Sequence, residues 1–311
     1  MGQNEDPLPS WNDRQTKQAI VQFINDTTTA GNKDYIIPED RIAVFDQDGT
    51  LWVEQPLYAQ FIFAMDTVKS NALKHPEWKH QQPYQAVIER DTDKIKNFTM
   101  EDIEKLIAAS HSNLSVDEFK DNVQSWLSQA LHPRFKKPYT DLIYQPMLEV
   151  IQYFKNHGYK VYIVSGGGQD FVRAYAEKIY GIPTQHVIGS AEKVKYEYRD
   201  GKPELMKLSE VFFINDKAGK PEAIHLFVGK RPVAAFGNSD GDRQMLEWSQ
   251  SSNGRSLQLL VHHDDAAHEY QYDTVSKVGT FSQQLMDEAK RNGWNVVSMK
   301  EDWKIIFPSD R

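Results

Sequence analysis

The chain has 311 residues, enough for one large core or for a core and a smaller domain at roughly 100 to 200 residues per domain. Its composition, with 40% hydrophobic and 26% charged residues, is typical of a folded globular protein, and its net charge of −8 argues against a nucleic-acid partner, which needs a basic surface. The absence of cysteine excludes disulfides, thiolate metal sites and a cysteine nucleophile.

No stretch reaches the roughly 18 consecutive apolar residues that a membrane helix requires, so the sequence predicts a soluble protein without a membrane partner. The polar start of the chain lacks the basic and then apolar pattern of a signal peptide. We therefore expect a cytoplasmic protein, or an exported or periplasmic one if a signal peptide has been removed. No pattern in the sequence indicates an oligomeric state.

The predicted elements begin with an amphipathic helix near residues 15–24, which is followed by a short apolar strand at 41–46. Further apolar runs predict strands at 160–165, 232–237 and 257–261. Between these four strands lie helical patterns at 146–157, 169–180, 220–228 and 240–249. Strands that alternate with helices predict an α/β fold, in which helices cover both faces of a doubly wound parallel sheet.

Residues 56–138 break this alternation. Apolar spacing predicts one helix there, two capping patterns predict two more, and no strong strand pattern intervenes. The sequence therefore predicts a helical insert between the first and second core strands. A smaller module at 186–213 contains Arg199-Asp200-Gly201, which is typical of a hairpin turn.

Asp46 and Asp48 stand directly after the first predicted strand, and Gly49 follows them. Two carboxylates at this spacing can converge on one cation and one phosphoryl group if the backbone turns, and glycine permits that turn. Turns rich in Asp and Gly are also common in loops without chemistry. The run Phe45-Asp46-Gln47-Asp48-Gly49-Thr50-Leu51 resembles the first motif of the haloacid dehalogenase superfamily, D-x-D-G-[TS].

This resemblance covers residues 40–265 and implies a Rossmann-like core with a helical cap domain inserted after the first core strand. The position of the insert resembles that of the cap in phosphoserine phosphatase-like members of the superfamily. The implied domains are a core of residues 1–55 and 139–311 and a cap of residues 56–138.

Other motifs of the superfamily can be matched in the same order along the chain. Ser165 ends the second core strand and precedes Gly166, and a hydroxyl followed by glycines at a helix start offers hydrogen-bond donors to a phosphoryl oxygen. The resemblance then implies a lysine whose charge neutralises the phosphoryl group and the nucleophile. Lys220 is the favoured candidate because Gly-Lys-Pro opens a predicted helix, and Lys217 is the alternative.

The fourth motif of the superfamily, G-D-x-x-x-D, resembles Gly237-Asn238-Ser239-Asp240-Gly241-Asp242, but here the first acid is replaced by Asn238. An amide oxygen can bind magnesium but contributes no charge. Either Asn238 keeps the ligand role or Asp240 takes it over, while Asp242 contacts a bound water or the lysine. Mg²⁺ is the implied cofactor, and its predicted ligands are Asp46, Asp48, Asn238, Asp240 and Asp242.

The resemblance implies a Mg²⁺-dependent phosphatase that hydrolyses a phosphate monoester through an aspartyl-phosphate on Asp46. Asp48 would act as general acid and base, and its presence favours phosphate transfer over dehalogenation, because a halide leaving group needs no proton. The implied catalytic residues are Asp46, Asp48, Ser165 and Lys220. Two alternatives stay open: a phosphomutase or phosphotransferase of the same superfamily, and a non-catalytic metal-binding protein on a retained fold.

Substrate choice depends on residues outside these motifs. Trp52 and Glu54 follow the first motif, and Arg134 lies where the insert returns to the core, so each is a candidate contact to the substrate. The predicted substrate-binding residues are Ser165, Gly166, Lys220, Trp52, Glu54 and Arg134. The cluster 262–265 after the fourth core strand is a further candidate, or a set of hydrogen-bonded loop residues. A closed cap favours a small phosphorylated metabolite as substrate.

Overall fold

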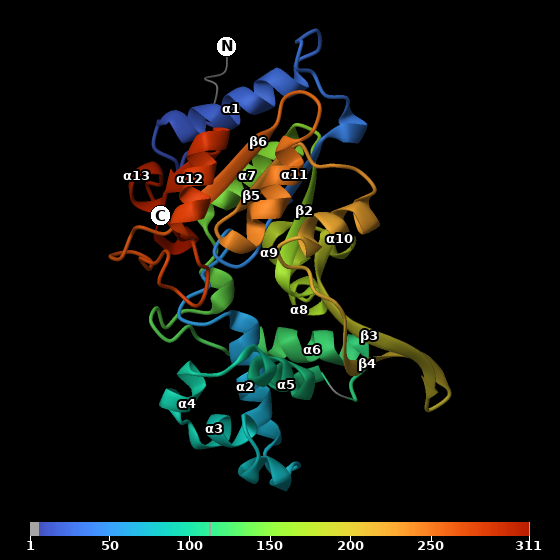
Figure 1. The fold of residues 1–311 in the computed structure, drawn as a ribbon. Helices are drawn as coiled ribbons and strands as arrows, with labels where there is room; N and C mark the ends of the chain where they lie inside the picture. The colour runs from blue at the N-terminus through green and yellow to red at the C-terminus, as the bar shows by residue number, and fades with distance from the viewer. Residues whose placement is uncertain (1–5, 112, 311) are drawn as a thin grey trace.

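The computed structural model describes residues 6–111 and 113–310, and within these ranges seven strands form one sheet (Figure 1). The strands are β1 (Ile42–Phe45), β2 (Lys160–Gly168), β3 (Val187–Arg199), β4 (Lys202–Phe213), β5 (Ala234–Gly237), β6 (Leu257–His262) and β7 (Asn295–Ser298). Their order across the sheet is β4-β3-β2-β1-β5-β6-β7, and all neighbours are parallel except β3 and β4. The predicted α/β fold with a doubly wound sheet is confirmed.

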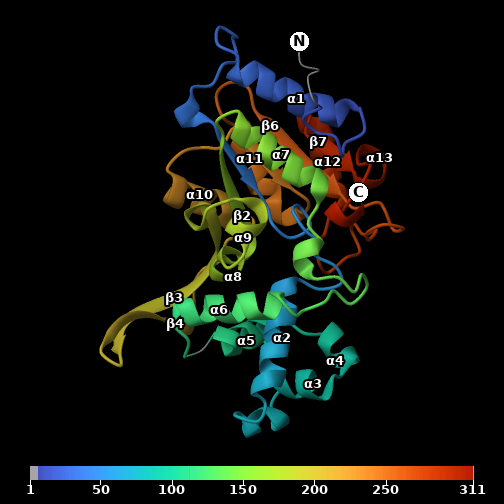
Figure 2. The same cartoon turned by 180° about the vertical axis from the view of Figure 1, so that it is seen from behind.

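Helices cover both faces of the sheet, as Figures 1 and 2 show from opposite sides. One face packs against α1 (Gln15–Thr28), α7 (Gln145–Asn156), α8 (Gln169–Arg173) and α9 (Ala176–Tyr180). The other packs against α10 (Gly219–Val228), α11 (Arg243–Gln250) and α12 (Gln283–Asn292). Strand β1 is apolar throughout because its side chains alternate between these two cores, with Phe45 in the first and Val44 in the second.

Among the described residues, five α-helices lie between β1 and α7, and in both views they occupy the lower part of the molecule, below the sheet (Figures 1 and 2). They are α2 (Ala59–Asn71), α3 (Tyr84–Glu89), α4 (Thr92–Lys96), α5 (Met100–His111) and α6 (Val116–Leu127). Most of them share a hydrophobic cluster of their own around Phe61, Val68 and Leu106. Ser115 and Glu118 form the predicted capping box at the start of α6. We call residues 56–138 the helical insert.

Strands β3 and β4 form the predicted hairpin, which projects away from the sheet past α6 (Figure 1). Arg199 pairs with Lys202, so the loop consists of Asp200 and Gly201, whose φ angles of 52° and 77° are those of a tight turn matched to strand twist. The first residues of β3 pair with β2 in the parallel part of the sheet. We call residues 187–213 the arm.

The structure differs from the predicted elements in three places. The helix predicted at 169–180 is interrupted near Tyr175, and the helix predicted from Asp240 begins only at Arg243, because 240–242 form a 3₁₀ turn. Strand β7 and helices α12 and α13 (Met299–Asp302) were not predicted, since β7 has only four residues. None of the described helices is both long and apolar enough to cross a lipid bilayer.

Candidate active site

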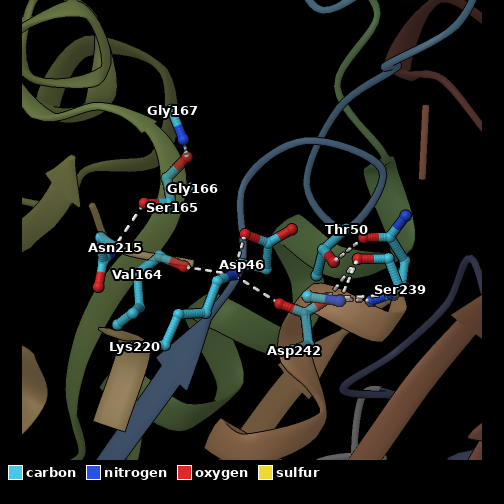
Figure 3. A network of polar contacts seen from close by, with 12 residues as sticks. Asp46, Thr50, Val164, Ser165, Gly166, Gly167, Asn215, Lys220, Ser239 and Asp242 are labelled. Atoms are coloured by element: carbon cyan, nitrogen blue, oxygen red, sulfur yellow. Dashed lines mark hydrogen bonds and ion pairs between the residues drawn. The ribbon is translucent and has the colours of Figure 1, made fainter. Parts of the chain in front are cut away.

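Lys220 joins the ends of three strands, as Figure 3 shows. Its Nζ lies 2.5 Å from Asp46 Oδ1 and 2.5 Å from Asp242 Oδ1, and it donates a third hydrogen bond to the carbonyl of Val164 at 2.9 Å. Both carboxylates and the lysine are almost fully buried. Lys217, the alternative lysine, is exposed, and only its backbone reaches this region, through a bond from its N–H to Gly241.

The charges of this cluster are not balanced, because two carboxyl groups contact one lysine. Burial alone would lower the pKa of Lys220, but the neighbouring carboxylates of Asp242 and Asp46 raise it well above its ordinary value, so the lysine stays charged. Burial and the charge of Asp242 raise the pKa of Asp46, and Lys220 offsets this only in part. An additional positive charge would stabilise the ionised form of Asp46.

Asp48 lies on the same turn and is held by Trp52. The indole Nε1 of Trp52 donates to Asp48 Oδ1 at 2.7 Å, and the indole stacks on Tyr175 with ring centroids 4.8 Å apart. Burial raises the pKa of Asp48 to about 6, although the bond from Trp52 acts in the opposite direction. Trp52 itself is fully buried, so it supports Asp48 rather than lining a surface where a substrate could lie.

Because the pairing of β2 with β3 is irregular between Val164 and Gly168, the end of β2 forms a loop-like segment, which polar contacts hold in place. Ser165 is buried, its Oγ accepts a hydrogen bond from the N–H of Gly167 at 3.0 Å, and its carbonyl accepts one from Asn215 Nδ2 at 2.8 Å. Gln60 of α2 accepts a bond from the N–H of Gly168 at 2.6 Å, which ties the helical insert to this loop. Sequence reasoning missed Asn215 and Gln60, because neither lies in a recognisable motif.

The loop after β5 separates the three predicted metal ligands from one another. Asp242 uses one oxygen for Lys220 and the other for the N–H groups of Asn238 and Ser239, at 2.9 and 3.0 Å. Asp240 instead accepts bonds from the backbone N–H and hydroxyl of Ser282 at the start of α12, at 3.1 and 2.8 Å. The structure therefore does not bring Asp240 to Asp46, because the 3₁₀ turn directs its side chain outward.

Asn238 connects the first motif to Glu54. Its Oδ1 accepts a bond from the Thr50 hydroxyl at 3.2 Å, and its Nδ2 donates to Glu54 Oε1 at 2.7 Å. Tyr272 donates a second bond to the same oxygen at 2.6 Å. Burial and the negative charges of Asp48 and Asp46 raise the pKa of Glu54 well above its ordinary value. Glu54, a predicted contact to the substrate, thus lies at the site. Its partner Tyr272 was not predicted, because no motif in the sequence marks it.

Arg134 does not reach the site, contrary to the expectation from its position in the sequence. Its guanidinium donates to the backbone carbonyls of Ala266 and Glu269, and it lies over the Tyr270 ring at 4.6 Å from the centroid. The donors that would bind an anionic substrate are used to hold the loop after β6.

His263 supports the turn that carries Asp46 and Asp48, and both of its ring nitrogens are bonded to protein groups rather than open to a substrate. It is buried, its Nε2 donates to the carbonyl of Gly49 at 2.8 Å, and its Nδ1 lies 3.0 Å from Glu269 Oε2. The two acids of the predicted 262–265 cluster form hydrogen bonds away from this turn. Asp264 bonds to Ser298, and Asp265 bonds to His268. Only His263 of this cluster contacts the turn that carries Asp46 and Asp48.

The donors fit a hard divalent cation such as Mg²⁺. Within residues 6–111 and 113–310, no three acidic or imidazole side chains converge as a metal cluster. A Mg²⁺ site of the expected kind needs only one carboxylate, together with carbonyl, amide and water oxygens. Asp46 offers such an oxygen, because Oδ1 accepts one hydrogen bond in the described part of the chain and keeps a second lone pair, while Oδ2 accepts none. The excess negative charge around Lys220 agrees with this fit.

Residues 43–247 match the family model described as haloacid dehalogenase-like hydrolase. The chain belongs to this family. The match begins in β1 and ends in α11, so it includes Asp46, Ser165, Lys220 and Asp242 but not the loop after β6.

Two solved structures illustrate the similarity of the fold. A conserved, functionally unknown protein from Anaerococcus prevotii DSM 20548 has a TM-score of 0.58 at 15% identity, with 99% of this chain and 98% of that chain covered. A protein with unknown function from Bordetella pertussis Tohama I has a TM-score of 0.50 at 17% identity, with 83% and 97% covered. At these identities the likeness extends to the fold alone. A comparison with curated protein sequences found no match.

Proposed function

We propose that this hydrolase is a Mg²⁺-dependent phosphatase, which hydrolyses a phosphate monoester through an aspartyl-phosphate on Asp46. The observation that carries the proposal is the position of Lys220, whose ammonium lies 2.5 Å from one oxygen of Asp46. The second oxygen of that carboxylate is left for attack on phosphorus. A fixed positive charge beside a carboxylate nucleophile offsets its repulsion from a phosphate group.

In the first step, Asp46 attacks phosphorus, an Asp46–phosphorus bond forms, and the bond between phosphorus and the ester oxygen breaks. Asp48 gives its proton to the departing alkoxide, which leaves as an alcohol. A carboxyl group with a pKa of about 6 can supply a proton near neutral pH. Ser165 and the N–H groups of the following glycines would hold the oxygens of the phosphoryl group.

In the second step, a water molecule attacks the phosphorus of the aspartyl-phosphate. Asp48, now ionised, takes a proton from this water, and the bond between Asp46 and phosphorus breaks to release inorganic phosphate. Asp46 returns as a carboxylate paired with Lys220. Asp48 therefore acts as acid and then as base, and Trp52 keeps it oriented in both steps.

Mg²⁺ would be held by the Asp46 carboxylate, the Asp48 backbone carbonyl and the Asn238 amide oxygen. When bound, it supplies positive charge that stabilises the negative oxygens of the phosphoryl group in the transition state. Asp242 would hold Lys220 rather than the ion, because both of its oxygens accept hydrogen bonds from the protein.

The helical insert would serve as the cap domain that closes over the site, and the remaining residues, 1–55 and 139–311, as the core domain. Gln60 of α2 already contacts the loop that follows Ser165. A cap that approaches the phosphate loop this closely leaves room for a small phosphorylated metabolite rather than a phosphoprotein.

Hydrolysis of an aryl phosphate, with and without Mg²⁺, tests the proposal in the wild type and in Asp46→Asn. The substitution keeps the shape of the side chain and removes its charge, so turnover should fall by about 1,000-fold or more, as for other nucleophiles. Asp287→Asn is the matched control, because that carboxylate is exposed on α12. Equal turnover by wild type and Asp46→Asn would rule out the aspartyl-phosphate.

A further inference from the structure

The proposed cation site lacks a carboxylate at position 238. Asp46 contributes one negative charge, whereas the Asp48 carbonyl and the Asn238 amide are neutral donors. Affinity for a divalent cation rises with the number of charged ligands, so the substitution at 238 removes charge from the shell that the family motif would supply. A second acidic group near Asn238 would restore it.

Glu54 is an acidic group in direct contact with Asn238. A carboxylate only accepts hydrogen bonds, so the amide must turn its nitrogen toward Glu54 Oε1, 2.7 Å away. The amide oxygen then points to the opposite side, where it meets the Thr50 hydroxyl of the catalytic turn at 3.2 Å. Glu54 thereby selects the orientation of Asn238 that offers oxygen rather than nitrogen to the first motif.

Two backbone segments pass so close to the Glu54 carboxylate that each has a glycine at the point of contact. The side chain is only 2% exposed, and two glycines with positive φ, Gly49 and Gly279, approach its Oε1 closely. A Cβ atom would lie 2.4 Å from this oxygen if added to Gly49 and 1.8 Å if added to Gly279. Larger residues at either position would displace the carboxylate, so both glycines serve to accommodate it.

Glu54 also lacks a cationic partner. No lysine, arginine or histidine of the described residues forms an ion pair with it, although other buried carboxylates of the chain, such as Asp46 and Asp242, pair with Lys220. Buried carboxylates are normally paired with a cationic side chain or with a metal ion. The cation expected beside Asp46 would supply the missing positive charge.

We propose that Glu54 and Asn238 act together in place of the acidic ligand that the fourth motif lacks. Asn238 offers its amide oxygen to the cation, and Glu54 holds the amide nitrogen and supplies the negative charge. Partners that orient a ligand in this way commonly change metal affinity by 10- to 100-fold when they are removed. The inference rests on the proposed function only in placing a divalent cation beside Asp46.

Mn²⁺ binding to the full chain without substrate tests this pairing, with free Mn²⁺ measured by electron paramagnetic resonance and Mg²⁺ added as competitor. Glu54→Gln keeps an oxygen that can accept from Asn238 and Tyr272, so it removes charge alone. We expect it to weaken Mn²⁺ binding by about 10- to 100-fold. Glu222→Gln, at an exposed position of α10, removes the same charge from the surface and should leave affinity unchanged.

The double variant Glu54→Gln with Asn238→Asp returns the charge to the position that the family motif uses, and it should recover most of the lost affinity. Melting curves of each variant without metal verify that the chain is folded. Unchanged affinity in Glu54→Gln, a double variant no better than Glu54→Gln, or a wild type that binds no Mn²⁺ would each overturn the pairing. The expected affinities in a protein that hydrolyses no phosphate ester would support the pairing and refute the phosphatase.

Discussion

Among the described residues, the Asp48 side chain accepts one hydrogen bond, from a residue four positions along the chain, and this bond sets its orientation. The Trp52 indole donates to Asp48 Oδ1 at 2.7 Å while its ring packs on Tyr175. A proton donor works only when it is aimed at the leaving oxygen, so this bond bears on the rate of the chemical step. The same tryptophan was expected from the sequence to contact the substrate, because spacing alone does not reveal that the ring is buried.

Trp52→Phe should slow release of an alcohol from an alkyl phosphate by about tenfold in a single turnover, a fraction of the full effect of a general acid. Release of p-nitrophenol from its phosphate should change much less, because that leaving group needs no proton. Trp126→Phe is the control, since its indole donates to Asp66 in the helical insert, away from the site. Equal losses on both substrates would argue that Trp52 only stabilises the fold.

At the scale of elements, a buried charge cluster joins the arm to the core and to the helical insert. Lys207 of β4 donates to Asp170 of α8 at 2.5 Å and to Glu192 of β3 at 3.0 Å, and it lies 4.8 Å from the Phe119 ring centroid in α6. Its side chain is fully buried. A two-stranded ribbon is marginally stable by itself, so this cluster helps to hold the arm in place.

Lys207→Met should lower the free energy of unfolding by roughly 1–3 kcal/mol, because it removes the nearest counter-charge from Asp170 and Glu192, whose side chains are 18% and 13% exposed. Urea denaturation provides the measurement. Lys193→Met is the control on the same arm, where the exposed pair with Glu210 should contribute little to stability. A loss from Lys207→Met no larger than that of Lys193→Met would mean that the buried cluster adds little to stability.

At the scale of the whole molecule, His132 links the two places where the chain passes between core and helical insert. Its Nε2 donates to the carbonyl of Gln55 on the outgoing segment at 2.7 Å, and its Nδ1 accepts from the N–H of Arg134 on the returning segment at 3.2 Å. This arrangement requires the neutral imidazole, since a protonated ring could not accept the second bond.

Stability should therefore fall on mild acidification through His132. Burial lowers the pKa of His132 from its ordinary value of 6.5, so below that pH the unfolded chain binds a proton that the folded chain resists. His132→Gln should show a smaller drop in unfolding free energy between pH 7.5 and pH 5.5 than the wild type does. His225→Gln, at an exposed position on α10, should behave like the wild type. Parallel pH curves for all three proteins would contradict this role.

The sequence predicted those site residues that follow strands, because parallel strands bring their carboxyl ends to one edge. Asp46 and Ser165 lie there for this reason, whereas Lys220 was predicted from the helix that it opens. The sequence could not predict contacts from distant segments without a local pattern, such as Gln60 and Tyr272. It also left open whether Asn238 or Asp240 supplies the metal ligand, because the direction of the Asp240 side chain depends on one 3₁₀ turn. The cap role of the helical insert stays a proposal.

The loop after β6 has a consequence for how such a site could diverge. Tyr272 contacts Glu54 and His263 contacts Gly49, yet both residues lie beyond residue 247, where the family match ends. Recombination within this one loop would alter the lining of the site and leave every motif residue in place. In the laboratory, the same segment is the natural choice for a library that seeks altered cation affinity with every motif residue unchanged.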